Sequence, residues 1–178
     1  TLNWQGERSS LTAGAHVSDY ARDHFLFVTP DYTNRVYDNT GHKQEQSAFV
    51  KGSITRGALD WHADVQLRRA AFRYEASPGT GFGSPSVDWV FVNPKVGVTW
   101  RARPSVELFA ALGQASREPT RSDMFAGADD LDDAAAAELL PLTRVKPERL
   151  TNLELGARLR RGRPQASVNA FAMQFRNE

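Results

Sequence analysis

Alternation of polar and apolar residues with a period of two constrains this chain more than any other feature of its sequence. Between residues 58 and 69, odd-numbered positions are apolar up to the last one and even-numbered positions are almost all polar. The two sets are Leu59, Trp61, Ala63, Val65 and Leu67 against Asp60, His62, Asp64, Gln66 and Arg68. Successive side chains of a β-strand point to opposite faces, whereas a helix would mix the two sets. The segment therefore predicts a strand with one apolar face and one water-facing face.

The same pattern recurs along the chain and predicts an all-β fold of roughly seven consecutive antiparallel strands. The other predicted strands are residues 10–20, 46–55, 92–101, 105–116, 152–160 and 165–175, with residues 1–5 as the tail of a preceding one. Tight turns at 6–9, 56–57, 103–104 and 161–164 alternate with long polar loops at 21–43, 75–88 and 117–147. All tight turns then lie at one end of the sheet and all long loops at the other. Transmembrane β-barrels have this asymmetry.

Two interpretations of the alternation remain open at this point. In a transmembrane barrel the apolar faces contact lipid and the polar faces line the interior. In a soluble antiparallel β-barrel or sandwich, acting as a binding or interaction module, Leu59, Trp61 and Val65 would face a closed core. The apolar faces are rich in Ala and Gly, which favours a lipid-facing wall, because a packed core needs complementary volumes.

Composition excludes several classes of function. The 178 residues carry 22 Lys and Arg against 21 Asp and Glu, a net charge of +1, so no nucleic-acid partner is expected. The chain has no Cys, which removes disulfides, thiolate zinc sites and cysteine nucleophiles. No apolar run approaches the roughly eighteen residues of a transmembrane helix. The sequence indicates no catalytic centre, no resident metal and no cofactor.

Three linked motifs in the second half of the chain identify a family. They are NPKVG at residues 93–97, SREP at 116–119 and PERLTNLELG at 147–156, followed by a strand with Asn169, Ala170 and Phe171. In this order and spacing they resemble the barrel domain of TonB-dependent outer-membrane receptors. The resemblance covers essentially all of residues 1–178, which are expected to form one partial barrel domain. Such barrels have about twenty-two strands around a plug.

The resemblance implies a role in nutrient uptake rather than in catalysis. Family members sit in the outer membrane of Gram-negative-type cells and import scarce nutrients of the ferric siderophore, haem or cobalamin class. Energy reaches them from the TonB system, which contacts the plug, and outer-membrane lipid surrounds the barrel. This chain is expected to be a fragment, because it shows neither the plug nor the aromatic-ended final strand and both ends cut through periodic segments.

Within the resemblance, a group of residues at the start of the longest loop is expected to face ligand or plug. The group is Arg117, Glu118, Arg121, Asp123 and Phe125. The polar members are interpreted first as structural contacts and second as the rim of a ligand pocket. Phe125, like Phe82, lies at a predicted loop tip, where it would either touch ligand or pack locally.

Two further clusters have a simple and a functional interpretation. His62 lies between Asp60 and Asp64 on one strand face, which would suit an acid–base or metal site, although a solvated interior wall explains it more simply. The acidic run at residues 129–133 would suit a calcium site, although acids at the start of a short helix are the favoured explanation.

Overall fold

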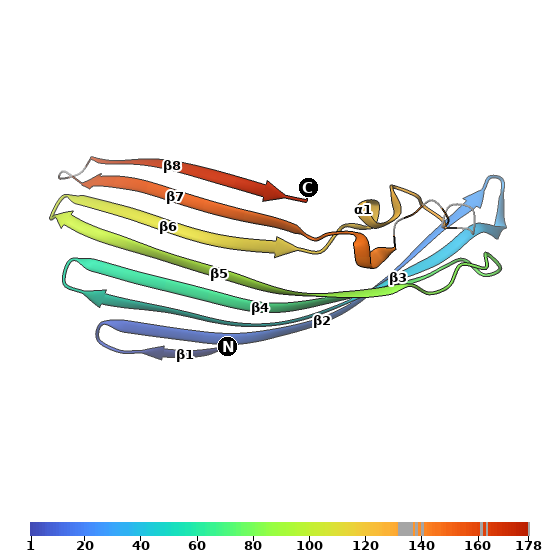
Figure 1. Cartoon of the computed structure of the whole chain (residues 1–178), viewed down its shortest axis with the longest axis horizontal. Coiled ribbons are helices and arrows are strands. Elements are labelled where there is room, and N and C mark those ends of the chain that lie inside the picture. Colours follow the sequence, from blue (N-terminus) through green and yellow to red (C-terminus); the bar gives the residue numbers. More distant parts are fainter. Residues whose placement is uncertain (132–136, 138, 140, 161, 163, 178) are drawn as a thin grey trace.

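A single antiparallel sheet makes up almost all of the computed structural model (Figure 1), which describes residues 1–131, 137, 139, 141–160, 162 and 164–177. Each strand pairs with its neighbour in sequence, in the order β1 to β8. The strands are β1 Leu2–Gln5, β2 Ser9–Val28, β3 Asp31–Arg56, β4 Leu59–Glu75, β5 Ser86–Arg103, β6 Val106–Arg117, β7 Glu148–Arg160 and β8 Gln165–Arg176. A short helix, α1 (Arg121–Phe125), and a 3-10 turn, η1 (Leu142–Arg144), lie between β6 and β7. The predicted all-β, antiparallel architecture is confirmed.

The strand register places polar residues beside polar residues and apolar beside apolar. Ser53 pairs with His62, which pairs with Gly97 on β5. One position along, Ile54 pairs with Trp61, which pairs with Val98. Because side chains alternate between faces, this register gives the sheet one polar face and one apolar face over its whole width.

The predicted loop at residues 21–43 is wrong, because β2 and β3 continue through it as a paired hairpin. The register runs unbroken from Ser9–Ile54 to Leu26–Tyr37 and is irregular only near the tip. Beyond Asp19, hydrophobic alternation stops because Arg22 and Asp23 place charges on both faces and the run from Phe25 to Val28 is apolar on both faces. Backbone hydrogen bonds continue the ladder regardless of side-chain polarity, so periodicity could not detect this part of the strands. The loop between β4 and β5 is likewise shorter than predicted.

Rows of polar residues end the apolar face on every strand from β2 to β8. The last apolar residues are Val17, Ala48, Leu67, Val90, Leu112, Leu153 and Ala172. The next residues on the same face are Asp19, Gln46, Arg69, Asp88, Gln114, Thr151 and Gln174. On β4, the apolar band from Leu59 to Leu67 is about 27 Å long, at about 3.4 Å per residue. At the other end of the band, Trp4, Trp61 and Trp100 lie next to the tight turns, which gather at one end of the sheet (Figure 1).

The apolar face does not form a closed core. Trp61, Val96 and Leu155 are 44%, 47% and 49% exposed, respectively. The alternative of a soluble barrel or sandwich predicted that Trp61 and Val65 would be sealed from solvent, and the structure shows them on an open face instead. Buried apolar side chains gather elsewhere, where the long loop meets the polar face: Tyr74, Met124, Phe125 and Leu131. Among the described residues, no helix is long and apolar enough to cross a membrane.

The hairpin extension leads to a direct test by hydrogen exchange. We expect a peptide spanning residues 20–26 to retain slow exchange at about half of its amides, because β2 pairs only with β3 there and alternate amides enter the ladder. A peptide spanning residues 78–84 should exchange completely, since these residues lie in the loop between β4 and β5. Mass spectrometry after deuterium labelling measures both. Complete exchange in both peptides would contradict the extended hairpin.

Candidate functional site

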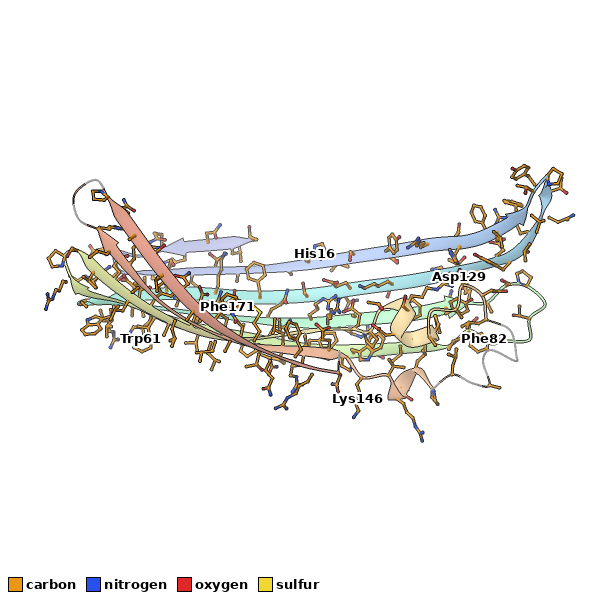
Figure 2. The ribbon with its side chains drawn as sticks, turned by 90° about the horizontal axis from the view of Figure 1, so that it is seen from above. His16, Trp61, Phe82, Asp129, Lys146 and Phe171 are labelled. Atoms are coloured by element: carbon orange, nitrogen blue, oxygen red, sulfur yellow. The ribbon has the colours of Figure 1, made fainter. Side chains whose placement is uncertain are left out.

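The long loop between β6 and β7 folds back onto the polar face of the sheet. Figure 2 shows Asp129 and Phe82 at the end of the sheet away from Trp61, on the side of the long loops. Three sets of contacts hold the loop there: an ion network at its start, an aromatic cluster around α1, and a group of hydrogen bonds near Asp129. Together they build the walls of a cavity.

An ion network at Glu118 makes the first set of contacts. Arg68 of β4 donates from Nη1 to Oε2 of Glu118 at 2.6 Å and from Nη2 to Oε1 at 3.0 Å. The same guanidinium donates to Glu45 at 2.6 Å, and Lys43 forms a further ion pair with Glu118. The side chains of Arg68 and Glu118 are 14% and 11% exposed, so the pair is nearly buried.

Electrostatics keep Glu118 ionised despite its burial. Burial alone would raise the pKa of this carboxyl, because a charge loses hydration there. Hydrogen bonds from Arg68 and Lys43 outweigh that effect and lower the pKa to about 2. Glu118 is therefore negatively charged over the whole physiological pH range and balances the positive charges of Arg68 and Lys43.

The other polar residues of the predicted site also make structural contacts. Arg117 pairs with Glu148 at 2.7 Å, across the first rung of β6 and β7. Arg121 donates to the backbone carbonyl of Asp129 at 2.6 Å and to Oδ1 of Asn39 at 3.2 Å. These contacts match the first interpretation given to both residues, as structural polar partners.

Asp123 caps α1 and lines a second cavity, of about 620 Å³, beside Arg144 and Lys146. Its carboxylate accepts hydrogen bonds from the backbone amide and the hydroxyl of Thr120, each at 2.7 Å. Thr120 in turn accepts from the amide of Asp123, which completes a capping box. The Thr120 hydroxyl, followed by its backbone amide, lowers the pKa of Asp123 below the ordinary value.

Phe125 is packed inside the loop cluster. It is 1% exposed, and its ring centroid lies 4.9 Å from that of Tyr74 and 6.1 Å from that of Phe72. Phe82 also packs against Tyr74, with ring centroids 6.1 Å apart. Both phenylalanines therefore make local packing contacts that join the loops to β4.

Hydrogen bonds near Asp129 hold the middle of the loop to the β2–β3 hairpin. Asn39, which is 1% exposed, donates to the Asp129 carbonyl at 3.0 Å and to Asp130 at 3.3 Å. Ser77 donates to Asp130 at 2.8 Å. Part of the acidic run, residues 132 and 133, lies outside the described residues, and the rest of the described chain holds no group of three metal-ligating side chains.

A cavity of about 390 Å³ lies between the start of the loop and the polar face of β2–β5. Its charged lining consists of Arg22, Lys43, Arg68, Arg117, Glu118 and Arg121, and its aromatic lining of Tyr20, Phe72, Tyr74 and Trp89. In the described part of the chain, Arg22 and Arg121 form no ion pair with a carboxylate. Cations beside aromatic rings suit a ligand that is both anionic and flat.

Three of the five residues predicted from the sequence, Arg117, Glu118 and Arg121, line this cavity. Sequence reasoning missed Lys43 and Tyr74, because it placed one at the end of a loop and the other beyond a strand. It also passed over Arg68, although the alternation around residues 58–69 places that side chain on the polar face. Arg68 could have been found from the sequence, because it is a cation on the polar face of a strand close to the predicted start of a long loop.

His62 and its two neighbouring aspartates do not make a catalytic centre. Asp60 accepts a hydrogen bond from Thr55 at 2.6 Å and one from Arg101, so it serves as a cross-strand partner. The ring of His62 lies over Gly97, where an added Cβ would meet Nε2 at 2.2 Å. Because Gly97 has no side chain, it leaves room for the imidazole of His62 on the polar face of the sheet.

The network at Glu118 predicts a strong effect of one substitution. Glu118→Gln should lower the free energy of unfolding by roughly 3 kcal/mol, because it leaves Arg68 nearly buried with one of its two carboxylate partners removed. Glu107→Gln, at the half-exposed pair with Arg158, should cost less than about 1 kcal/mol. Urea titration measures both.

Since folding lowers the Glu118 pKa from 4.5 to about 2, the contribution of the ionised Glu118 to the free energy of unfolding should be complete above pH 4.5 and disappear as the pH falls through 2. Equal losses in the two variants would contradict the network.

Comparisons with known proteins support one family assignment. A family model described as "TonB dependent receptor-like, beta-barrel" matches residues 1–178. No curated protein matches. Among solved structures, the copper transporter OprC is 17% identical with a TM-score of 0.72, and the match covers 97% of this chain and 28% of that one. The ferric-catecholate import receptor Fiu of E. coli K12 is 10% identical with a TM-score of 0.71, covering 99% and 30%.

The ferric citrate transporter FecA is 14% identical with a TM-score of 0.66, covering 97% of this chain and 26% of that one. At these identities the likeness shows the fold alone. The chain spans between 26% and 30% of the length of these three proteins. Since the family model covers every residue, the chain belongs to the β-barrel domain family of TonB-dependent receptors, a family of transporters and not of enzymes.

Proposed function

We propose that this chain forms part of the barrel wall of an outer-membrane receptor that actively imports a scarce nutrient. The observation that carries the proposal is the apolar band, bounded by polar rows on one side and by tryptophans on the other. A band about 27 Å long along a strand tilted by about 40° is about 20 Å tall, near the roughly 25 Å of transmembrane barrels. Aromatic residues such as Trp61 and Trp100 belong at the interface between lipid and water.

In this arrangement the long loops are extracellular and the cavity opens toward the barrel interior. The nutrient is of the ferric siderophore, haem or cobalamin class, and the cavity beneath the long loop supplies part of its binding surface. Arg22 and Arg121 attract its negative charge, and Tyr20 and Trp89 stack on its flat parts. Arg117 and Glu118 form the rim of this cavity, while Asp123 and Phe125 hold α1 in place behind the rim.

Import in this proposal requires a plug inside the barrel and energy from the TonB system. The polar face of β3–β5 would contact the plug through side chains such as Lys51, Asp64 and Lys95, which stand side by side in the register. A charged, hydrated wall suits a plug that must move, because polar contacts exchange readily with water. Outer-membrane lipid would cover the apolar face.

Charge insertion tests the membrane placement. Val65→Arg, at the middle of the apolar band, should lower the free energy of unfolding in lipid vesicles by about 2–4 kcal/mol. Gln114→Arg, on the same face at the polar row, should cost at most about 1 kcal/mol, because an arginine there reaches the interface. Both variants are measured in the complete receptor by urea titration. Equal small losses at the two positions would contradict burial of the band in lipid.

Uptake assays test the proposed cargo. A strain that lacks the gene should fail to accumulate one labelled nutrient among a ferric siderophore, haem and cobalamin, and the same uptake should stop in a strain without TonB. Arg22→Ala should weaken binding of that nutrient about tenfold, since an unpaired cation of the cavity is removed. Arg8→Ala, at a tight turn on the opposite end of the sheet, is the matched control. Unchanged uptake of all three nutrients would contradict the proposal.

A further inference from the structure

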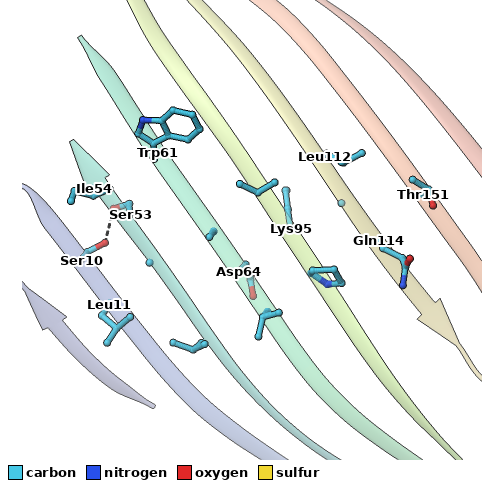
Figure 3. A pocket seen from close by; sticks show the side chains of 17 residues that line it. Ser10, Leu11, Ser53, Ile54, Trp61, Asp64, Lys95, Leu112, Gln114 and Thr151 are labelled. Atoms are coloured by element: carbon cyan, nitrogen blue, oxygen red, sulfur yellow. Dashed lines mark hydrogen bonds between the residues drawn. The ribbon is translucent and has the colours of Figure 1, made fainter. Parts of the chain in front are cut away.

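A hollow of about 260 Å³ lies on the polar face of β2–β5, nearer to the tight turns than the cavity beneath the long loop. Its side chains come from two rungs of the sheet: Thr12, Lys51, Asp64 and Lys95 in one, and Ser10, Ser53 and His62 in the other. Figure 3 shows the hydrogen bond between Ser10 and Ser53, with Asp64 and Lys95 on the next two strands. Each of these side chains can donate or accept a hydrogen bond.

The two lysines of the hollow have no carboxylate partner in the described part of the chain. Asp64 stands between Lys51 and Lys95 in the register, yet neither lysine lies within ion-pair distance of it. Elsewhere on the same face opposite charges on neighbouring strands do meet, as Arg101 pairs with Asp60. The two ammonium groups of the hollow are therefore available to an anion.

Two glycines shape the hollow by making room for its side chains. A Cβ added to Gly113 of β6 would lie 3.5 Å from Cγ of Lys95, so this lysine leans toward β6 and away from Asp64. The imidazole of His62 likewise lies over Gly97 of β5. Both side chains lean toward the following strand, and the space in front of β3 and β4 stays open.

The groups around the hollow suit the oxygens of a carboxylate or a phosphate. Two lysines against one aspartate give it an excess of positive charge, and the hydroxyls of Ser10 and Ser53, 2.8 Å apart, supply further donors. The carboxylate of Asp64 repels an anion in part, so binding there is weaker than the lysines alone would give. Weak binding suits a group that must leave again in the course of transport.

A continuous polar surface joins this hollow to the cavity beneath the long loop. On β4, Asp64 lies four residues from Arg68 of that cavity, which is about 13 Å along the strand. Gln66 stands between them and accepts a hydrogen bond from Asn93 at 3.1 Å. A molecule that moves from the cavity toward the tight turns therefore reaches the hollow without crossing an apolar surface.

We propose that the hollow is a second, weaker station for an anionic cargo on its way along the barrel wall, where Lys51 and Lys95 bind a carboxylate or phosphate group of the cargo after it leaves the cavity beneath the long loop. This proposal rests on the proposed function in nutrient import. While the plug fills the barrel, the lysines face the plug, and movement of the plug exposes them to the cargo. A second cationic site on the wall speeds transport, because it raises the local concentration of an anion at an intermediate position.

The experiment replaces both lysines in the complete receptor and measures uptake by cells. Lys51→Gln combined with Lys95→Gln should lower the initial rate of uptake at saturating labelled nutrient about fivefold, because the intermediate position loses its cations. Equilibrium binding of the nutrient to cells without TonB should stay unchanged, since the cavity beneath the long loop is intact. The double variant Lys51→Arg with Lys95→Arg keeps both charges and should keep the wild-type rate.

A matched control lies on the same face at the same depth. Glu154 of β7 shares a rung with His62, across Gly97 and Ala111, but lies outside the hollow. Glu154→Gln should therefore leave the uptake rate unchanged. The amount of folded receptor in the outer membrane and the entry of vancomycin, which reports a loosened plug, are recorded for every variant.

Several outcomes would overturn the proposal. They are a full uptake rate in the glutamine variant, an equal loss in the arginine variant or in Glu154→Gln, and weaker equilibrium binding with an unchanged maximal rate. Increased vancomycin entry in the glutamine variant would show that the lysines hold the plug, and would count against the station in the same way. A wild-type strain that takes up none of the three nutrients would contradict the proposed function instead.

Discussion

Separation of polarity across a single sheet is the constraint on which the rest of this structure depends. In hydrocarbon every backbone amide and carbonyl needs a protein partner, so strands must pair along their whole length. The ladders that join β2 to β8 into one sheet go far toward meeting this requirement, although the β5–β6 ladder extends only from Lys95 to Arg103 on β5 and shifts register after Arg101. Side chains then decide only which solvent each face meets, and the register from Ile54 to Trp61 to Val98 keeps one face apolar throughout. In the proposed membrane placement the wall needs no closed core, because lipid is the partner of its apolar face.

The stability of the long loop has a different origin. Near Glu118 the apolar band has ended, and ion pairs, hydrogen bonds and a small buried cluster around Phe125 hold the chain. Arg68 joins two carboxylates, Asn39 binds the loop backbone, and Phe125 fills the space beside Tyr74. The loop therefore belongs to the wall, and contacts between its own side chains and the sheet shape the cavity beneath it.

Sequence patterns predicted the parts of this fold that depend on hydrophobic periodicity. The faces of β4 and the tight turns followed from alternation and from glycine and proline. Periodicity could not reveal the β2–β3 extension, where Asp19 and Arg22 are polar on opposite faces and only backbone pairing defines the strand. The candidate site was predicted in part: Arg117, Glu118 and Arg121 line the cavity, but their partners Lys43 and Asn39 come from the segment predicted as loop. Contacts between segments so distant in sequence depend on register, which composition does not encode.

The most direct test of the central claim measures which solvent each residue of β4 meets. Residues 1–178 contain no cysteine, so a single cysteine placed at each of residues 59 to 67 is the one thiol of this segment, and any cysteine elsewhere in the complete receptor is first replaced by serine. In lipid vesicles, labels at odd positions should collide with oxygen dissolved in the bilayer, and labels at even positions with a water-soluble nickel complex, in strict alternation. Odd positions shielded from both reagents would show a closed protein core and contradict this account.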